Sequence, residues 1–147
     1  MYEAAFAKLQ PRYGHWVIFN HCMPFDVTRA YDKAMRAELK AAADRKSIPL
    51  RTNGVMAVYN GPRFETAAEI RLSALAGATV VGMTGCPEAT LAVEAGLRFA
   101  GIPLVANPAA GVSDAVISHE GVGEVVKASA AKVLEIFDEA IVAISNL

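Results

Sequence analysis

The sequence is poor in several features that define whole classes of protein. Only two cysteines are present, Cys22 and Cys86, with neither the spacing of a zinc site nor the number that a disulfide framework needs. No hydrophobic run approaches the roughly 20 residues of a membrane span, and Met1 is not followed by a basic and apolar secretory signal. The net charge of −1 gives no electrostatic footprint for nucleic acid. We therefore expect a soluble cytoplasmic protein with reduced thiols and with no nucleic-acid or membrane partner.

Apolar residues, in contrast, are abundant. They make up 54% of the 147 residues, enough for a well-buried core, and we expect one domain spanning 1–147. His21 precedes Cys22, so a catalytic Cys-His pair can be imagined. Adjacent side chains rarely point the same way, and no third group is evident to orient them, so ordinary thiols are expected instead.

Buried strands and amphipathic helices alternate along the chain, which predicts an α/β fold. The expected strands are 16–20, 50–59, 79–83 and 102–106, and the expected helices are 25–46, 65–75, 87–97 and about 122–144. Asp26 is expected to cap the first helix. Because ligands of open α/β sheets bind at the carboxyl ends of the strands, the turns at 61–65 and 83–85 and the loop from Asn107 are the candidate site.

The first of these turns carries Arg63, Phe64 and Glu65 immediately before a helix. Phe64 can stack on a planar ring, and Glu65 can accept hydrogen bonds from ring N–H groups. Core packing is the alternative role for Phe64, and a charge favoured by the helix dipole is the alternative for Glu65. Arg63 is expected to be solvated or structural rather than a ligand contact.

The second and third candidate segments follow the next two expected strands. Thr84 offers a hydroxyl before a helix, where free backbone N–H groups suit an anion. Met83 can make a flexible apolar contact, with simple core packing as its alternative. Asn107 is both donor and acceptor, so it can bridge a ring nitrogen and a carbonyl, although Asn-Pro also starts turns. Together the three segments suggest a pocket for a heteroaromatic base with a sugar beside it.

Three motifs at this spacing, YNGPRFETAAEI, VVGMTGCPEATLAVEAGL and NPAAG, resemble the second half of a known family. This is the trimeric purine nucleoside phosphorylase and methylthioadenosine phosphorylase family, with most likeness to its branch acting on 5′-methylthioinosine. The resemblance runs from about His21 to the C-terminus. It implies a three-layer α/β fold with a mixed sheet flanked by helices, of which this chain would form the incomplete C-terminal half, in a homotrimer.

The resemblance also implies roles for individual residues at the base. Phe64 would lie along the purine, and Glu65 would accept from the N1–H of a 6-oxopurine. Asn107 would be the catalytic residue, hydrogen-bonding N7 and O6 as negative charge builds on the departing purine. Adenine-cleaving members carry a small hydroxyl residue and an Asp at the Glu65 and Asn107 positions, so both residues favour hypoxanthine or guanine.

The sugar and phosphate contacts are implied in the same way. Met83 would pack under the ribose, and Thr84 would donate to phosphate. Val122, at the start of the last helix, would favour an apolar 5′-methylthio group, although His119 is three residues away and is the alternative match. His21 would reach the neighbouring active site across a trimer interface, with a structural His as the alternative.

The implied activity is phosphorolysis of 5′-methylthioinosine or another 6-oxopurine nucleoside to free purine and sugar 1-phosphate, a pentosyltransferase reaction. Phosphate would be the co-substrate, and no metal or organic cofactor is expected. Residues 1–20 lack the family's Gly-rich turn and Arg-His pair, so Thr84 alone represents the phosphate site. Either a missing N-terminal half completes the enzyme, as part of a longer gene or as a separate polypeptide, or the chain is a non-catalytic purine-binding protein. A generic dinucleotide-binding domain is disfavoured because no GxGxxG turn is present.

Overall fold

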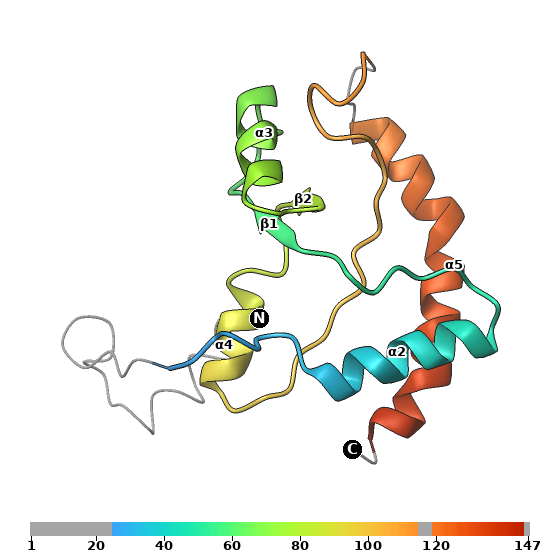
Figure 1. The fold of residues 1–147 in the computed structure, drawn as a ribbon. Helices are drawn as coiled ribbons and strands as arrows, with labels where there is room; N and C mark the ends of the chain where they lie inside the picture. Colours follow the sequence, from blue (N-terminus) through green and yellow to red (C-terminus); the bar gives the residue numbers. More distant parts are fainter. Residues whose placement is uncertain (1–24, 115–118, 146–147) are drawn as a thin grey trace.

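The computed structural model describes residues 25–114 and 119–145, which form helices around a small parallel sheet (Figure 1). The elements in chain order are α2 (Lys33–Arg45), β1 (Met56–Val58), α3 (Ala67–Leu75), β2 (Val80–Gly82), α4 (Glu88–Glu94) and α5 (His119–Ile144). Alternating strands and helices confirm the predicted α/β class. None of the helices in the described ranges is long and apolar enough to cross a membrane.

Strands β1 and β2 pair in parallel, and α3 is the crossover between them. The register places Met56 beside Val80 and Val58 beside Gly82. Just beyond the strands, Tyr59 N donates to Gly82 O over 2.9 Å. Both strands therefore end at the same edge, which brings the turns that follow them together.

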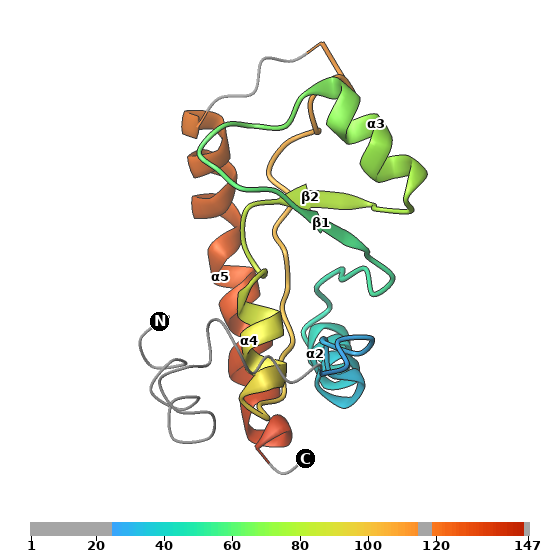
Figure 2. The same cartoon turned by 90° about the vertical axis from the view of Figure 1, so that its left-hand side faces the viewer.

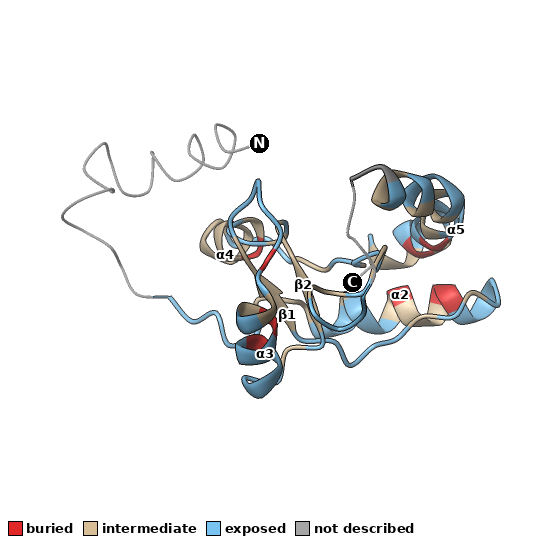
Figure 3. Cartoon of the chain, turned by 90° about the horizontal axis from the view of Figure 1, so that it is seen from above, coloured by how far each residue is buried: buried red, intermediate tan, exposed pale blue. Residues whose placement is uncertain are grey.

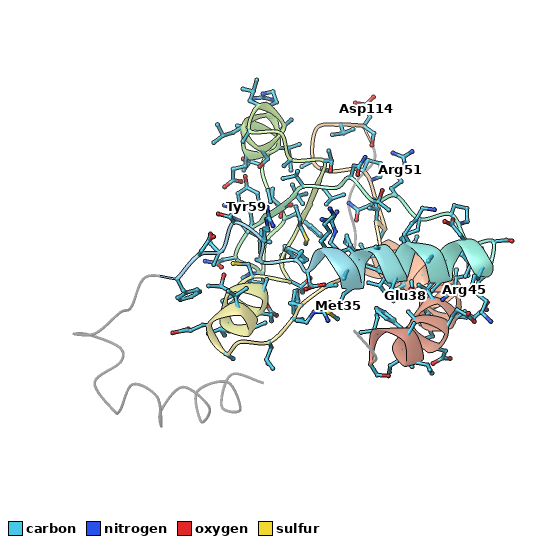
Figure 4. The ribbon with its side chains drawn as sticks, turned by 60° about the horizontal axis from the view of Figure 1, so that its bottom comes forward. Met35, Glu38, Arg45, Arg51, Tyr59 and Asp114 are labelled. Carbon is cyan, nitrogen blue, oxygen red and sulfur yellow. The ribbon has the colours of Figure 1, made fainter. Side chains whose placement is uncertain are left out.

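The main core lies between α2 and α5, two helices far apart in the sequence (Figure 3). Its buried apolar members are Leu39, Ala42, Ala43, Ile136 and Ala140. Ion pairs rim this contact, because Arg45 binds Glu38 over 2.6 Å and Glu139 over 2.7 Å. Figure 4 shows Glu38 and Arg45 on the side of α2 next to α5. Small alanine side chains let the two helix backbones approach closely.

The first helix begins later than predicted. It starts at Lys33 rather than at residue 25, and its cap is Asp32, whose Oδ1 accepts from Met35 N over 2.8 Å. Asp26 instead accepts from Thr28 N over 2.7 Å in a local turn. The prediction that Asp26 caps the helix is wrong because its carboxylate closes this turn.

The predicted strands are shorter than expected or missing. The expected strand 50–59 is reduced to Met56–Val58, and 79–83 to Val80–Gly82. Residues 102–106 are extended but form no strand, because none of the backbone hydrogen bonds in the described ranges involves them. This segment runs between the sheet and α5 with Val105 63% exposed (Figure 1). The expected strand 16–20 lies outside the described residues.

The remaining helices are confirmed with shifted bounds. The expected helices 65–75 and 87–97 correspond to α3 and α4, which are shorter, and 122–144 corresponds to the longer α5. Their predicted positions were more accurate than those of the strands because helix hydrogen bonds are local, whereas a strand needs a partner.

Candidate functional site

The turn after β1 is braced by a network centred on Glu69. Thr66 caps α3, with its Oγ1 accepting from Glu69 N over 3.2 Å and its own N donating to Glu69 Oε2 over 2.7 Å. Arg63 binds the same carboxylate through both terminal nitrogens, at 2.9 and 2.7 Å. The Arg63 hydrogen bonds, with further ones from Thr66, lower the pKa of Glu69 to about 2. The expectation that Arg63 is structural is therefore confirmed.

This brace determines how the two residues between Arg63 and Thr66 are presented. Phe64 is 40% exposed, so it is not a core residue and its ring is accessible. Glu65 is only 8% exposed, and its Oε1 is buried with no hydrogen-bond partner in the described part of the chain. A buried carboxylate oxygen without a donor is costly unless a ligand supplies one. The acidic residue of the first turn of α3 is Glu69, so the helix-dipole alternative does not account for Glu65.

The turn after β2 lies directly against the turn after β1. A Cβ placed on Gly61 would lie 2.9 Å from Sδ of Met83, so the two turns are in contact. Met83 is half-buried, and Thr84 is exposed just before α4. Gly85 follows with φ +89°, a conformation that favours glycine. The structure thus places an apolar side chain and an exposed hydroxyl next to each other at this edge.

The third segment reaches the same place through Gly111. A Cβ on Gly111 would lie 2.6 Å from Cβ of Ala67, so the loop packs on the start of α3 (Figure 2). Asn107 is half-buried, and its Nδ2 donates to Pro108 O over 2.8 Å. That local bond fits the turn-forming alternative for Asn107, and it leaves the second N–H and the amide oxygen available for a ligand. The turns after β1 and β2 therefore meet at the carboxyl end of the sheet, and the loop that follows Asn107 packs on the start of α3.

The predicted residues for the sugar's 5′ end and the trimer interface are less well placed. Helix α5 begins at His119, three residues before the expected start, so His119 and Val122 both lie near its N-terminus. The start of the last helix therefore does not favour Val122 over His119. Val122 is partly buried, and His21 lies outside the described residues. No cluster of three metal-binding side chains occurs within 25–114 and 119–145.

Two groups near the second turn were not indicated by sequence patterns. Glu88 is the first residue of α4, as expected for a charge in a first turn, but its Oε2 is buried with no partner within the described ranges. Tyr31 lies before α2, yet its hydroxyl reaches Gly85. No local sequence signal could identify Tyr31, because its contact joins segments more than fifty residues apart.

Comparison of the sequence with known protein families identifies the family to which this fold and these turns belong. The model of the phosphorylase superfamily matches residues 9–142, and the chain belongs to this superfamily. The expected family resemblance and the phosphorylase-type α/β fold are thus confirmed.

Individual relatives are similar over most of this chain. A probable 6-oxopurine nucleoside phosphorylase of Korarchaeum cryptofilum is 43% identical, covering 80% of this chain and 40% of the relative. A probable S-methyl-5′-thioinosine phosphorylase of Pseudomonas syringae pv. tomato is 44% identical, covering 74% of this chain and 47% of the relative. The structure of methylthioadenosine phosphorylase from Schistosoma mansoni in complex with adenine superposes with a TM-score of 0.80 at 28% identity, covering 86% of this chain and 50% of that one. The chain thus spans about half or less of the length of these proteins.

Proposed function

We propose that this chain supplies the base-recognising half of a purine nucleoside phosphorylase acting on 6-oxopurine nucleosides. The observation that carries this proposal is the buried Oε1 of Glu65, which has no donor in the described part of the chain, beside the accessible ring of Phe64. A 6-oxopurine offers an N1–H donor at its edge and a flat face for stacking. Adenine has no N1–H, so it would leave this oxygen unpaired. The names of the two sequence relatives support the same substrate class.

Asn107 is the proposed catalytic residue. In phosphorolysis, phosphate attacks C1′ of the sugar while the bond from C1′ to the purine nitrogen breaks, and the purine departs with negative charge. The Asn107 side chain would bond N7 and O6 as that charge develops. Its Nδ2 donates one N–H to Pro108 O, so its second N–H would serve as the donor to the departing purine.

Thr84 and Met83 would face the phosphate and the sugar, respectively. Thr84 alone does not neutralise a phosphate dianion, and the nearby Arg63 is already paired with Glu69. The proposed active assembly therefore requires the half of the phosphorylase domain that the relatives have beyond the matched region, and we expect it to be a cytoplasmic homotrimer without a metal or an organic cofactor. Whether Val122 or His119 meets the 5′ group would decide between 5′-methylthioinosine and ordinary nucleosides.

Reconstitution tests this proposal. The purified chain alone should release no hypoxanthine from 5′-methylthioinosine, and adding the N-terminal half of the Pseudomonas syringae relative should restore release that depends on phosphate. Asn107→Ala should lower kcat in that assembly about 100-fold, since one lost transition-state donor has an effect of this size. Reactions without phosphate and assemblies without this chain serve as controls.

The second candidate function is purine binding without turnover, which the single hydroxyl of Thr84 at the phosphate position favours. If the reconstituted assembly binds hypoxanthine but never cleaves the nucleoside, the enzyme proposal is wrong and the binding function stands. If neither this chain nor the reconstituted assembly binds a purine, both the enzyme proposal and the binding proposal are wrong.

A further inference from the structure

Tyr31 joins the start of α2 to the turn that follows β2. A Cβ on Gly85 would lie 3.1 Å from the Tyr31 hydroxyl, and one on Gly101 would lie 4.0 Å from Cε1 of its ring. The phenol ring therefore lies between two segments of the chain. The hydroxyl lies close to Gly85, the residue after Thr84, where a side chain would crowd the hydroxyl and would adopt a strained backbone.

Residues 98–99 hold the ring and the residue that follows it. Phe99 makes an edge-to-face contact with Tyr31, with ring centroids 5.4 Å apart. The next residue, Asp32, donates its N–H to Phe99 O over 2.7 Å, and its carboxylate binds Arg98 through two bonds of 2.9 and 2.8 Å. The ring contact of Tyr31 with Phe99 and the bonds of Asp32 to Phe99 and Arg98 leave Tyr31 little freedom to move away from Gly85.

The surroundings also keep the phenol neutral. Burial raises the pKa of Tyr31, and the nearby groups of Cys86 and Glu88 raise it further. The turn itself is closed by one backbone bond, from Ala89 N to Gly85 O over 3.0 Å. A neutral phenol next to Gly85 adds no negative charge of its own to the turn.

We propose that Tyr31 is a positioning residue for the turn of Thr84 and Gly85, fixing where the Thr84 hydroxyl points. The packing role rests on the contacts above. The consequence for phosphate affinity rests on the proposed function, in which the Thr84 hydroxyl donates to phosphate. Tyr31 touches no reacting atom, so its effect must pass through Gly85.

Hydrogen exchange of the full chain tests the packing role directly. Tyr31→Ala and the milder Tyr31→Phe should speed amide exchange in peptides covering 85–91, by about tenfold for alanine, while peptides of the α2–α5 contact stay as in the wild type. Tyr59→Phe is the matched control, since the hydroxyl of Tyr59 bonds Ser73 Oγ and Glu69 O on α3 instead (Figure 4). That control should leave exchange in 85–91 unchanged.

A second measurement keeps the proposal testable if Tyr31→Ala does not fold. Gly85→Ala should be destabilising, and the Tyr31→Phe background should relieve part of that loss because the hydroxyl is the atom in the way. Strictly additive effects, or faster exchange spread evenly over the whole chain, would overturn the positioning role.

Kinetics of the reconstituted enzyme then separate this proposal from the function on which it rests. Tyr31→Phe should raise the KM for phosphate severalfold and leave the KM for the nucleoside unchanged. A local exchange response without a change in phosphate KM would uphold the positioning of the turn and contradict its assignment to phosphate.

Discussion

Glu65→Gln should make the unliganded chain more stable and its purine site weaker. The substitution keeps the shape of the side chain and removes the charge from an oxygen that is buried without a donor. A neutral amide is cheaper to bury than a carboxylate. Sites built for a ligand often carry this kind of unfavourable group, and neutralising it separates stability from function.

The magnitudes follow from the burial of the side chain, which is 8% exposed. An unsatisfied buried polar group costs about 1–3 kcal/mol, and more when charged, so neutralising it should add about 1 kcal/mol to the free energy of unfolding. For a domain of this size that raises Tm by about 3 °C. Hydrogen bonds to a charged acceptor are roughly twice as strong as neutral ones, so hypoxanthine affinity should fall about tenfold.

Differential scanning fluorimetry and calorimetric titration with hypoxanthine and adenine measure both effects. The hypoxanthine preference over adenine should shrink in Glu65→Gln, because the new amide can donate to the unprotonated N1 of adenine. Glu88→Gln is the matched control, since its Oε2 is also buried without a partner within the described ranges but lies at the start of α4. It should leave hypoxanthine affinity within about twofold.

A lower Tm with unchanged selectivity would refute this reasoning. It would mean that Glu65 is satisfied by groups of the protein and serves the fold. An equal loss of hypoxanthine affinity in Glu88→Gln would show that the effect is a general consequence of lost buried charge.

Three further predictions concern the fold that holds the site. Ile136→Val should lower the free energy of unfolding by about 0.5–1.5 kcal/mol, because Ile136 is only 2% exposed in the α2–α5 core. Urea unfolding with an unchanged m-value measures this loss. A loss near zero would mean that the core is loosely packed. Thr66→Ala should lower the free energy of unfolding by about 1 kcal/mol, as measured in thermal melts followed by circular dichroism. Thr66→Ser should retain the cap and the stability. Equal losses in the two variants would contradict the capping role. Glu69 has its pKa lowered from 4.5 to about 2, so its contribution to stability is full above about pH 4.5 and is lost as the pH falls toward 2. Acid titration of Glu69→Gln should show a flatter loss of stability across that window, and an unchanged profile would argue against the Arg63 pair.

Local patterns predicted the helices better than the strands. Helix α3 was predicted nearly to its ends, since its hydrogen bonds are internal and Thr66 and Glu69 signal its start. The predicted start of α2 was wrong because Asp26 and Asp32 are both residue types that cap helices, and the structure shows Asp32 accepting from Met35 N whereas Asp26 accepts from Thr28 N in a local turn. The apolar run 102–106 has the composition of a strand, but composition does not supply a neighbouring strand.

In the candidate site, too, some features could be predicted from the sequence and others could not. The meeting of the turns after β1 and β2, which carry Phe64 and Thr84, follows from a general rule about parallel sheets, so it could be predicted. The position of the Asn107 loop does not follow from that rule, because residues 102–106 form no strand. The exposure of Phe64 and the unpaired oxygen of Glu65 depend on how the Arg63 brace packs, so they required coordinates. The contact of Tyr31 with Gly85 joins distant segments, which no single-sequence pattern specifies.

The core between α2 and α5 has a consequence during synthesis. Arg45 and its partner Glu139 are 94 residues apart, so α2 leaves the ribosome long before the helix that covers it has been made. At the usual elongation rates of about 5–20 residues per second, this delay is roughly 5 to 20 s. For that time the apolar face around Leu39 has no cover from α5, and the nascent chain is a natural client for chaperones that bind exposed apolar helices.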